Sequence, residues 1–137
     1  MKANLEHLAD RLIREDKGVL LLPHVGVDGD ALGSSLAISR MLTTLQIKNV
    51  VLTDEVVPEL LHFIPESETV QIFEDKEPSQ WQDYGFRLLV DCHEANRIGK
   101  RAVLVTDDSE KGSIDHHESD IEMAKTDLVD KTASSTA

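Results

Sequence analysis

Residues 18–34 of the 137-residue chain are GVLLLPHVGVDGDALGS, and they contain the clearest indication of its architecture. The apolar run Val19 to Leu22 is typical of a short strand buried on both faces of a sheet. A glycine-rich turn follows, and residues 31–45 then place apolar side chains at helical spacing. Residues 49–53, NVVLT, are the next strand candidate. A strand, a helix and a strand in this order predict a βαβ unit, and therefore a parallel sheet flanked by helices.

The same pattern continues on both sides of this unit. Residues 3–16 predict an amphipathic helix, and residues 86–90, FRLLV, predict a buried strand. A short strand is expected at Ile114, whereas residues 102–106 fit either a strand or the end of a helix begun at Ala95. The length suits one domain with a substantial core. We therefore expect a single α/β domain with a mostly parallel sheet.

The middle and the end of the chain give weaker signals. Prolines interrupt residues 55–83, where residues 59–64 favour a short helix and residues 70–73 a strand. The last residues, VDKTASSTA, are small and polar. This composition is typical either of a disordered tail or of a point at which a longer chain was cut.

Composition limits the class of function. The chain has 26 Asp and Glu against 14 Lys and Arg, a formal net charge of −12. Proteins that coat long nucleic acids or bind anionic membranes normally have the opposite balance, so a phosphate-bearing ligand must be met by a few local cations or by bound metal. The single cysteine, Cys92, suits a reducing compartment, and the apolar runs are too short for a signal core or a membrane span. We therefore expect a cytoplasmic protein without membrane or long-duplex partners.

Metal-ligand side chains follow three of the expected strands. They are His24, Asp28 and Asp30 after the first, Asp91 after FRLLV, and Asp115, His116 and His117 after Ile114. Ligands of open α/β sheets bind at the carboxyl ends of the strands, so these side chains should converge on one rim. Clustered carboxylates repel one another and favour a cation, and carboxylates with imidazoles suit Mn²⁺, Zn²⁺ or Fe²⁺ better than Ca²⁺. Two ions fit this ligand number if Asp91 bridges them, and paired metals suit phosphoester hydrolysis.

Each of these pieces also has a purely structural interpretation. Residues 28–30 form a turn sequence, and Asp30 is a candidate helix cap. Cys92 fits a small buried apolar residue. Three further histidines are interpreted as surface or packing residues: His7, His62 and His93. The joint occurrence of ligand residues at three strand ends favours the functional interpretation.

With these residues assembled, the chain resembles the DHH phosphoesterase family. The family's first motif, H-x-x-P-D-x-D-A-x-G-S, is matched by residues 24–34, with Val27 in place of the proline. The later matches are Val90-Asp91-Cys92 with Asn96-Arg97-Ile98-Gly99, then Asp115-His116-His117, and finally Asp130 with the segment ASSTA. The branch it resembles most is that of the bacterial oligoribonucleases and 3′-phosphoadenosine 5′-phosphate phosphatases, the nano-RNases.

This resemblance implies a Rossmann-like sheet with helices on both faces and a site for two Mn²⁺ ions, with Mg²⁺ or Co²⁺ as substitutes. One ion would be held by His24, Asp28 and Asp91, and the other by Asp30, Asp91 and His116. The implied substrates are short RNA or a nucleoside bisphosphate, and many members of the family are dimers.

The resemblance also implies roles for three residues beside the metals. His117 would face the substrate phosphate and stabilise its developing charge. Asp115 would orient a histidine rather than bind metal, and this pair forms the expected catalytic group. Arg97 is a candidate phosphate contact, with an ion pair to a neighbouring carboxylate as the alternative.

Members of this family also have a fourth motif with a further metal-binding Asp and a C-terminal substrate-binding domain, and neither is found within residues 1–137. We therefore expect residues 1–137 to be the N-terminal catalytic domain with most of the metal site. Three alternatives stay open: a family II inorganic pyrophosphatase, a metal-binding domain inactive alone, and a receiver-like domain with Asp91 as phosphoacceptor. The last leaves the histidines of the motifs without a task.

Overall fold

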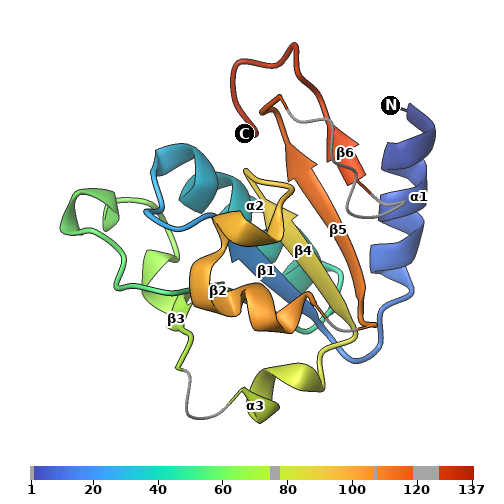
Figure 1. Ribbon diagram of the computed structural model, residues 1–137, viewed down its shortest axis with the longest axis horizontal. Coiled ribbons are helices and arrows are strands. Elements are labelled where there is room, and N and C mark those ends of the chain that lie inside the picture. The colour runs from blue at the N-terminus through green and yellow to red at the C-terminus, as the bar shows by residue number, and fades with distance from the viewer. Residues whose placement is uncertain (1, 75–77, 107, 119–126) are drawn as a thin grey trace.

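The computed structural model describes residues 2–74, 78–106, 108–118 and 127–137. Its strands form one six-stranded sheet in the order β3-β2-β1-β4-β5-β6, and every pairing is parallel (Figure 1). The strands are β1 (Val19–Pro23), β2 (Asn49–Thr53), β3 (Gln71–Ile72), β4 (Phe86–Val90), β5 (Glu110–Asp115) and β6 (Asp127–Val129). The predicted α/β class and parallel sheet are confirmed.

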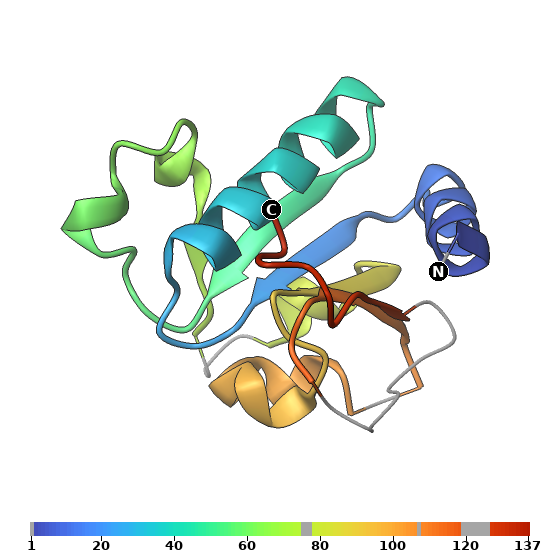
Figure 2. The ribbon, with the colours of Figure 1, turned by 90° about the horizontal axis from the view of Figure 1, so that it is seen from above.

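Helices cover both faces of the sheet, as expected (Figure 2). The α-helices are α1 (Lys2–Ile13), α2 (Gly29–Thr44) and α3 (Ser79–Gln82), and the 3₁₀ helices are η1 (Glu59–Leu61), η2 (Ser67–Thr69), η3 (Ala95–Arg97) and η4 (Gly99–Leu104). One core cluster joins the apolar sides of α1 and α2 to the sheet, and a second joins α3 and η4 to the opposite face. In the described part of the chain, no helix combines the length and apolarity needed to cross a membrane.

The segment from Ala95 follows the helical alternative that its sequence suggested, but as two 3₁₀ helices, η3 and η4, rather than as one α-helix. Arg101 is fully buried in η4, with its Nε 2.7 Å from Asp54 Oδ1 and its Nη1 donating to the Leu52 carbonyl at 2.6 Å. Gly99 begins η4 with a φ of 58°, and a Cβ at this position would lie 2.2 Å from Asp54 Oδ2. Segment η4 is thus held against the end of β2 by a buried ion pair, which leaves no pattern in the local sequence.

The short edge strand β6 was not predicted from the sequence. It has only three residues and begins at the buried Asp127, whose Oδ1 accepts a hydrogen bond of 2.9 Å from the Ser113 hydroxyl. A buried carboxylate is unusual in a strand, and the hydroxyl of Ser113 in β5 gives this one a hydrogen-bond donor.

The strand order places the functional rim. The chain moves outward from β1 to β2 and β3, then returns through β4 on the other side of β1. Such a reversal opens a crevice at the carboxyl ends of the two central strands. Pro23 of β1 is level with Val90 of β4, so His24 and Asp91 follow at the same height.

Candidate metal centre

Asp91 lies at the centre of the predicted site, directly after β4. It is 2% exposed, and its Oδ2 lies 3.2 Å from His24 Nε2 while its Oδ1 lies 3.4 Å from His116 Nε2. Its backbone is left-handed, with a φ of 60°, which is uncommon outside glycine and concentrates at functional sites. One buried carboxylate therefore touches imidazoles from both neighbouring strands.

The first predicted ligand group lies together. Donor atoms of His24, Asp28 and Asp91 all lie within 4.8 Å of one another, and His24 Nε2 is 3.7 Å from Asp28 Oδ1. His24 Nδ1 lies 2.6 Å from the Val25 carbonyl, which can only accept, so this nitrogen bears the proton. This leaves Nε2, the nitrogen that faces the two carboxylates, as the atom that would bind a metal ion.

The helix cap is Asp28 rather than Asp30, the residue that the sequence suggested. Asp28 is the N-cap of α2, because its Oδ1 accepts a hydrogen bond of 2.9 Å from the Ala31 backbone N–H. Asp30 lies inside the first turn of the helix and faces across the crevice, with its Oδ2 3.5 Å from His116 Nε2. The predicted second group, Asp30, Asp91 and His116, is thus also brought together.

The C-terminal segment lies against these carboxylates. The Thr136 N–H donates to Asp30 Oδ2 at 2.9 Å, and the Ala137 N–H donates to Asp30 Oδ1 at 2.9 Å. The Thr136 hydroxyl donates to Asp91 Oδ1 at 2.7 Å. Of the two interpretations of residues 129–137, the disordered tail is therefore wrong. The motif likeness of ASSTA was the only signal in the sequence for the position of Thr136.

Burial and neighbouring charges act differently on the two shared aspartates. Burial raises the pKa of Asp91 above its usual range; the Thr136 hydroxyl opposes this rise, and the charges of Asp30 and Asp28 reinforce it. Burial would also raise the pKa of Asp30, but the N–H groups of Thr136 and Ala137 bring it below its usual range. A cation beside Asp91 would relieve this repulsion, so the donor set fits a divalent metal.

Asp115 lies beside this group and holds two imidazoles. Its Oδ1 accepts from His117 Nδ1 at 2.6 Å, and its Oδ2 accepts from Nδ1 of the buried His93. Burial works against ionisation, but these hydrogen bonds bring the pKa of Asp115 below its usual range. His93 was interpreted as a surface or packing residue; nothing in its spacing indicated this contact.

Two other predicted residues lie near the rim. Arg97 and His117 line a cavity of about 220 Å³ together with Cys92, His93, Glu94, Asp115 and Glu118. Among the described residues Arg97 makes no ion pair, and its carbonyl accepts from the Val25 N–H at 2.8 Å. Burial raises the pKa of the Cys92 thiol to about 12, so Cys92 is protonated at neutral pH.

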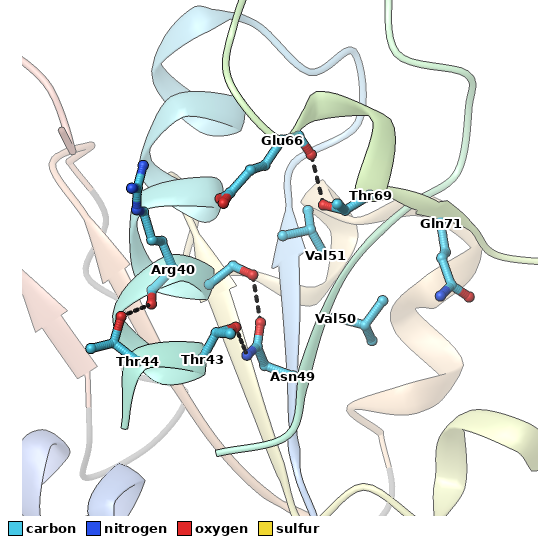
Figure 3. Close-up of a pocket in the computed structure, with 10 residues that line it drawn as sticks. Arg40, Thr43, Thr44, Asn49, Val50, Val51, Glu66, Thr69 and Gln71 are labelled. Atoms are coloured by element: carbon cyan, nitrogen blue, oxygen red, sulfur yellow. Dashed lines mark hydrogen bonds between the residues drawn. The ribbon is translucent and has the colours of Figure 1, made fainter. Parts of the chain in front are cut away.

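A larger cavity, of about 530 Å³, lies between α2 and the amino end of β2 (Figure 3). Its polar side chains bond to groups of the same cavity: Thr44 to the Arg40 carbonyl, Thr69 to the Glu66 carbonyl, and Asn49 to Thr43. The metal-ligand residues lie on the carboxyl-end rim instead. Size alone therefore does not identify the functional site.

The family model described as "DHH family, N-terminal domain" matches residues 18–137. The chain belongs to the DHH family. The region that matches the DHH family includes every predicted metal ligand. No curated protein matches the chain.

A solved structure shares the fold of this domain. It is a crystal structure of an exopolyphosphatase-related protein from Bacteroides fragilis, with a TM-score of 0.89 and 21% sequence identity. The superposition covers 99% of this DHH chain but 41% of the other protein, so the present chain spans less than half of that relative. At this identity the likeness shows the fold.

Proposed function

We propose that this DHH domain hydrolyses phosphoester bonds with a two-metal site that prefers Mn²⁺. The observation that supports it best is the position of Asp91, whose two oxygens face separate ligand groups. One ion would be held by His24, Asp28 and Asp91, and the other by Asp30, Asp91 and His116. When bound, such ions polarise the phosphoryl oxygens, activate water and stabilise the leaving oxygen.

The remaining residues of the rim would position the substrate. His117 is held through Nδ1 by Asp115, and its side chain is 49% exposed, so its Nε2 is accessible to a phosphoryl oxygen. Asp115 accepts from the Nδ1–H of His117 and orients the ring. The imidazolium form of His117, with its second proton on Nε2, would donate to that phosphoryl oxygen. Arg97, at the end of η3, adds a permanent positive charge beside the same cavity.

We propose short oligoribonucleotides or 3′-phosphoadenosine 5′-phosphate as substrates, in the cytoplasm, as for the nano-RNase branch. The motif likeness in residues 97–101 and 114–119 supports this choice. The cavity of about 220 Å³ suits part of one nucleotide rather than a duplex. A homodimer is part of the same proposal, since many DHH proteins form one.

The decisive experiment pairs metal binding with turnover in the 137-residue protein. We expect Mn²⁺ to bind by calorimetry and to support release of mononucleotides from a 5′-phosphorylated diribonucleotide. Asp91→Asn should lose both properties, whereas Asp83→Asn, an exposed aspartate remote from the rim, should keep both. Absence of Mn²⁺ binding in the wild-type protein would overturn the metal site, and binding without turnover would identify a metal-binding domain inactive alone.

A second candidate reaction is hydrolysis of a phosphoanhydride such as pyrophosphate. The observation in its favour is the description of the structural neighbour as exopolyphosphatase-related. Turnover of pyrophosphate, but not of the diribonucleotide, by the same Mn²⁺-loaded protein would select it.

A further inference from the structure

His93 is a buried polar residue for which the proposed metal chemistry has no use. It follows β4 by three positions and is 4% exposed. Its Nδ1 is hydrogen-bonded to Asp115 Oδ2, while its Nε2 is buried with no hydrogen-bond partner among the residues that the structure describes. Buried polar atoms are rarely left without a partner, so this nitrogen requires an explanation.

The contact with Asp115 determines what the free nitrogen can do. An ionised carboxylate only accepts hydrogen bonds, so Nδ1 of His93 bears the proton. Nε2 of the neutral ring is then an acceptor with an unused lone pair. His117 is bound to the other oxygen of Asp115 in the same manner, which directs both Nε2 atoms away from that carboxylate.

His93 lines a cavity next to the metal centre, and its free nitrogen is enclosed in the wall of that cavity. His93, Asp115 and His117 all line the cavity of about 220 Å³. Asp115 and His117 also belong to the group that clusters with Asp91 and His116 within 4.8 Å. A molecule with its phosphate at the metal centre can therefore extend into this cavity.

The charges around the cavity favour a neutral donor there. Glu94 and Glu118 line it together with Arg97, so the carboxylates outnumber the permanent cations in its wall. A hydroxyl group can donate to the lone pair of Nε2 and needs no counter-charge.

We propose that His93 Nε2 accepts a hydrogen bond from a sugar hydroxyl of the bound nucleotide, a contact that rests on the proposed phosphoesterase site. His93 is then a specificity-determining residue: it recognises the sugar while Asp115 holds its ring. The chemical class it selects is a nucleotide with a free ribose hydroxyl rather than its deoxy counterpart.

The test is a binding comparison in the presence of Mn²⁺. The probes are adenosine 5′-monophosphate and its 2′-deoxy and 3′-deoxy analogues, titrated calorimetrically into the 137-residue protein. For the wild-type protein we expect one deoxy analogue to bind about threefold to tenfold more weakly, the effect of one hydrogen bond.

Two substitutions separate the two nitrogens of the ring. The amide of His93→Asn can still donate to Asp115 from near the Nδ1 position but offers no acceptor at Nε2. The longer His93→Gln can place an amide oxygen near Nε2 but loses the contact with Asp115. We expect His93→Asn to bind the three probes equally and His93→Gln to keep the preference for the hydroxyl, with the Mn²⁺-dependent thermal shift present in both.

Several results would overturn the proposal: no difference among the probes in the wild-type protein, no binding of any probe, an unchanged preference in His93→Asn, or equal loss in both variants. The last would show that His93 acts only through the structure. Failure of the phosphoesterase function gives a different result, because the diribonucleotide then stays intact whatever the binding preference is.

Discussion

The ends of β4 and β5 each have a buried aspartate, but the pKa values of the two carboxyl groups are shifted in opposite directions. Asp91 directly follows β4, and Asp115 is the last residue of β5. Both side chains are nearly inaccessible, with 2% of Asp91 and 4% of Asp115 exposed. The pKa of Asp91 is raised, first by burial and then by the charges of its aspartate neighbours. The pKa of Asp115 is lowered, because hydrogen bonds from His117, His93 and two backbone N–H groups outweigh its burial.

This difference in pKa distinguishes Asp91, whose surroundings favour a bound cation, from Asp115, whose oxygens already have hydrogen-bond donors. Asp115 has a donor for each oxygen within the chain, so it stabilises the fold as an ionised group. Asp91 shares its surroundings with Asp30 and Asp28, and in the protein alone its ionised form is unfavourable. Replacing each by the uncharged asparagine should therefore have opposite effects on stability.

The largest expected effect is on metal binding through Asp91. Mn²⁺ at about 100 times its dissociation constant should stabilise the wild-type protein by roughly 2.7 kcal/mol, a shift of several degrees in the melting temperature. Asp91→Asn should abolish this shift. Without metal the variant should melt at or above the wild-type temperature, because the unfavourable charge is gone. Melting curves with Mn²⁺ and with a chelator measure both effects, and an equal Mn²⁺ shift in the two proteins would contradict the position of the ions.

The second effect is a loss of stability at Asp115. Asp115→Asn removes the charge that accepts from two imidazoles, so we expect the metal-free protein to lose roughly 1.5–3 kcal/mol of unfolding free energy. Urea unfolding in the presence of a chelator measures this loss. The matched control is Asp108→Asn, an exposed aspartate that should change little. If the metal-free Asp115→Asn variant were more stable than the wild-type protein, the Asp115 carboxylate, like that of Asp91, would be unfavourable without a bound cation.

The smallest effect is the pH dependence of the metal-free protein. Because the folded pKa of Asp115 is lowered, its stabilisation is complete above about pH 4, the usual aspartate value, and is lost as the pH falls through the folded pKa. The pKa of Asp91 is raised, so its contribution is present below about pH 4 and is lost as the pH rises through its folded value. The free energy of unfolding of each asparagine variant can be measured between pH 3 and 7 and compared with that of the wild-type protein. Asp115→Asn should lose less stability than the wild-type protein as the pH falls. The stability of Asp91→Asn relative to the wild-type protein should increase as the pH rises. If the stability of both variants changed with pH in the same way, the opposite pKa shifts of Asp91 and Asp115 would be contradicted.

The buried strands could be predicted because their signal is local. Residues 19–22 are a continuous apolar run, and residues 49–53 and 86–90 are mostly apolar; all three segments lie in strands of the sheet. Segment η4 and strand β6 depend instead on buried polar pairs, Arg101 with Asp54 and Asp127 with Ser113. Such pairs join residues far apart in the chain, so their short sequences contain no periodic pattern to detect.

The metal-ligand residues could be proposed from the sequence because each follows a predicted strand of a parallel sheet. That rule requires only the strand ends and the residue types. His93 and Thr136 do not follow from it. His93 contacts Asp115 across 22 positions of sequence, and Thr136 contacts Asp91 across 45.

The amino-acid sequence by itself determined the parallel sheet and the set of acids and imidazoles at its rim, since apolar runs and strand ends are properties of neighbouring residues. Only the tertiary structure decided the electrostatic state of each carboxylate. Asp91 and Asp115 have the same intrinsic chemistry, and what separates them is which donors and which charges the fold brings within a few ångströms. In a buried site those through-space contacts outweigh the residue's own ordinary pKa.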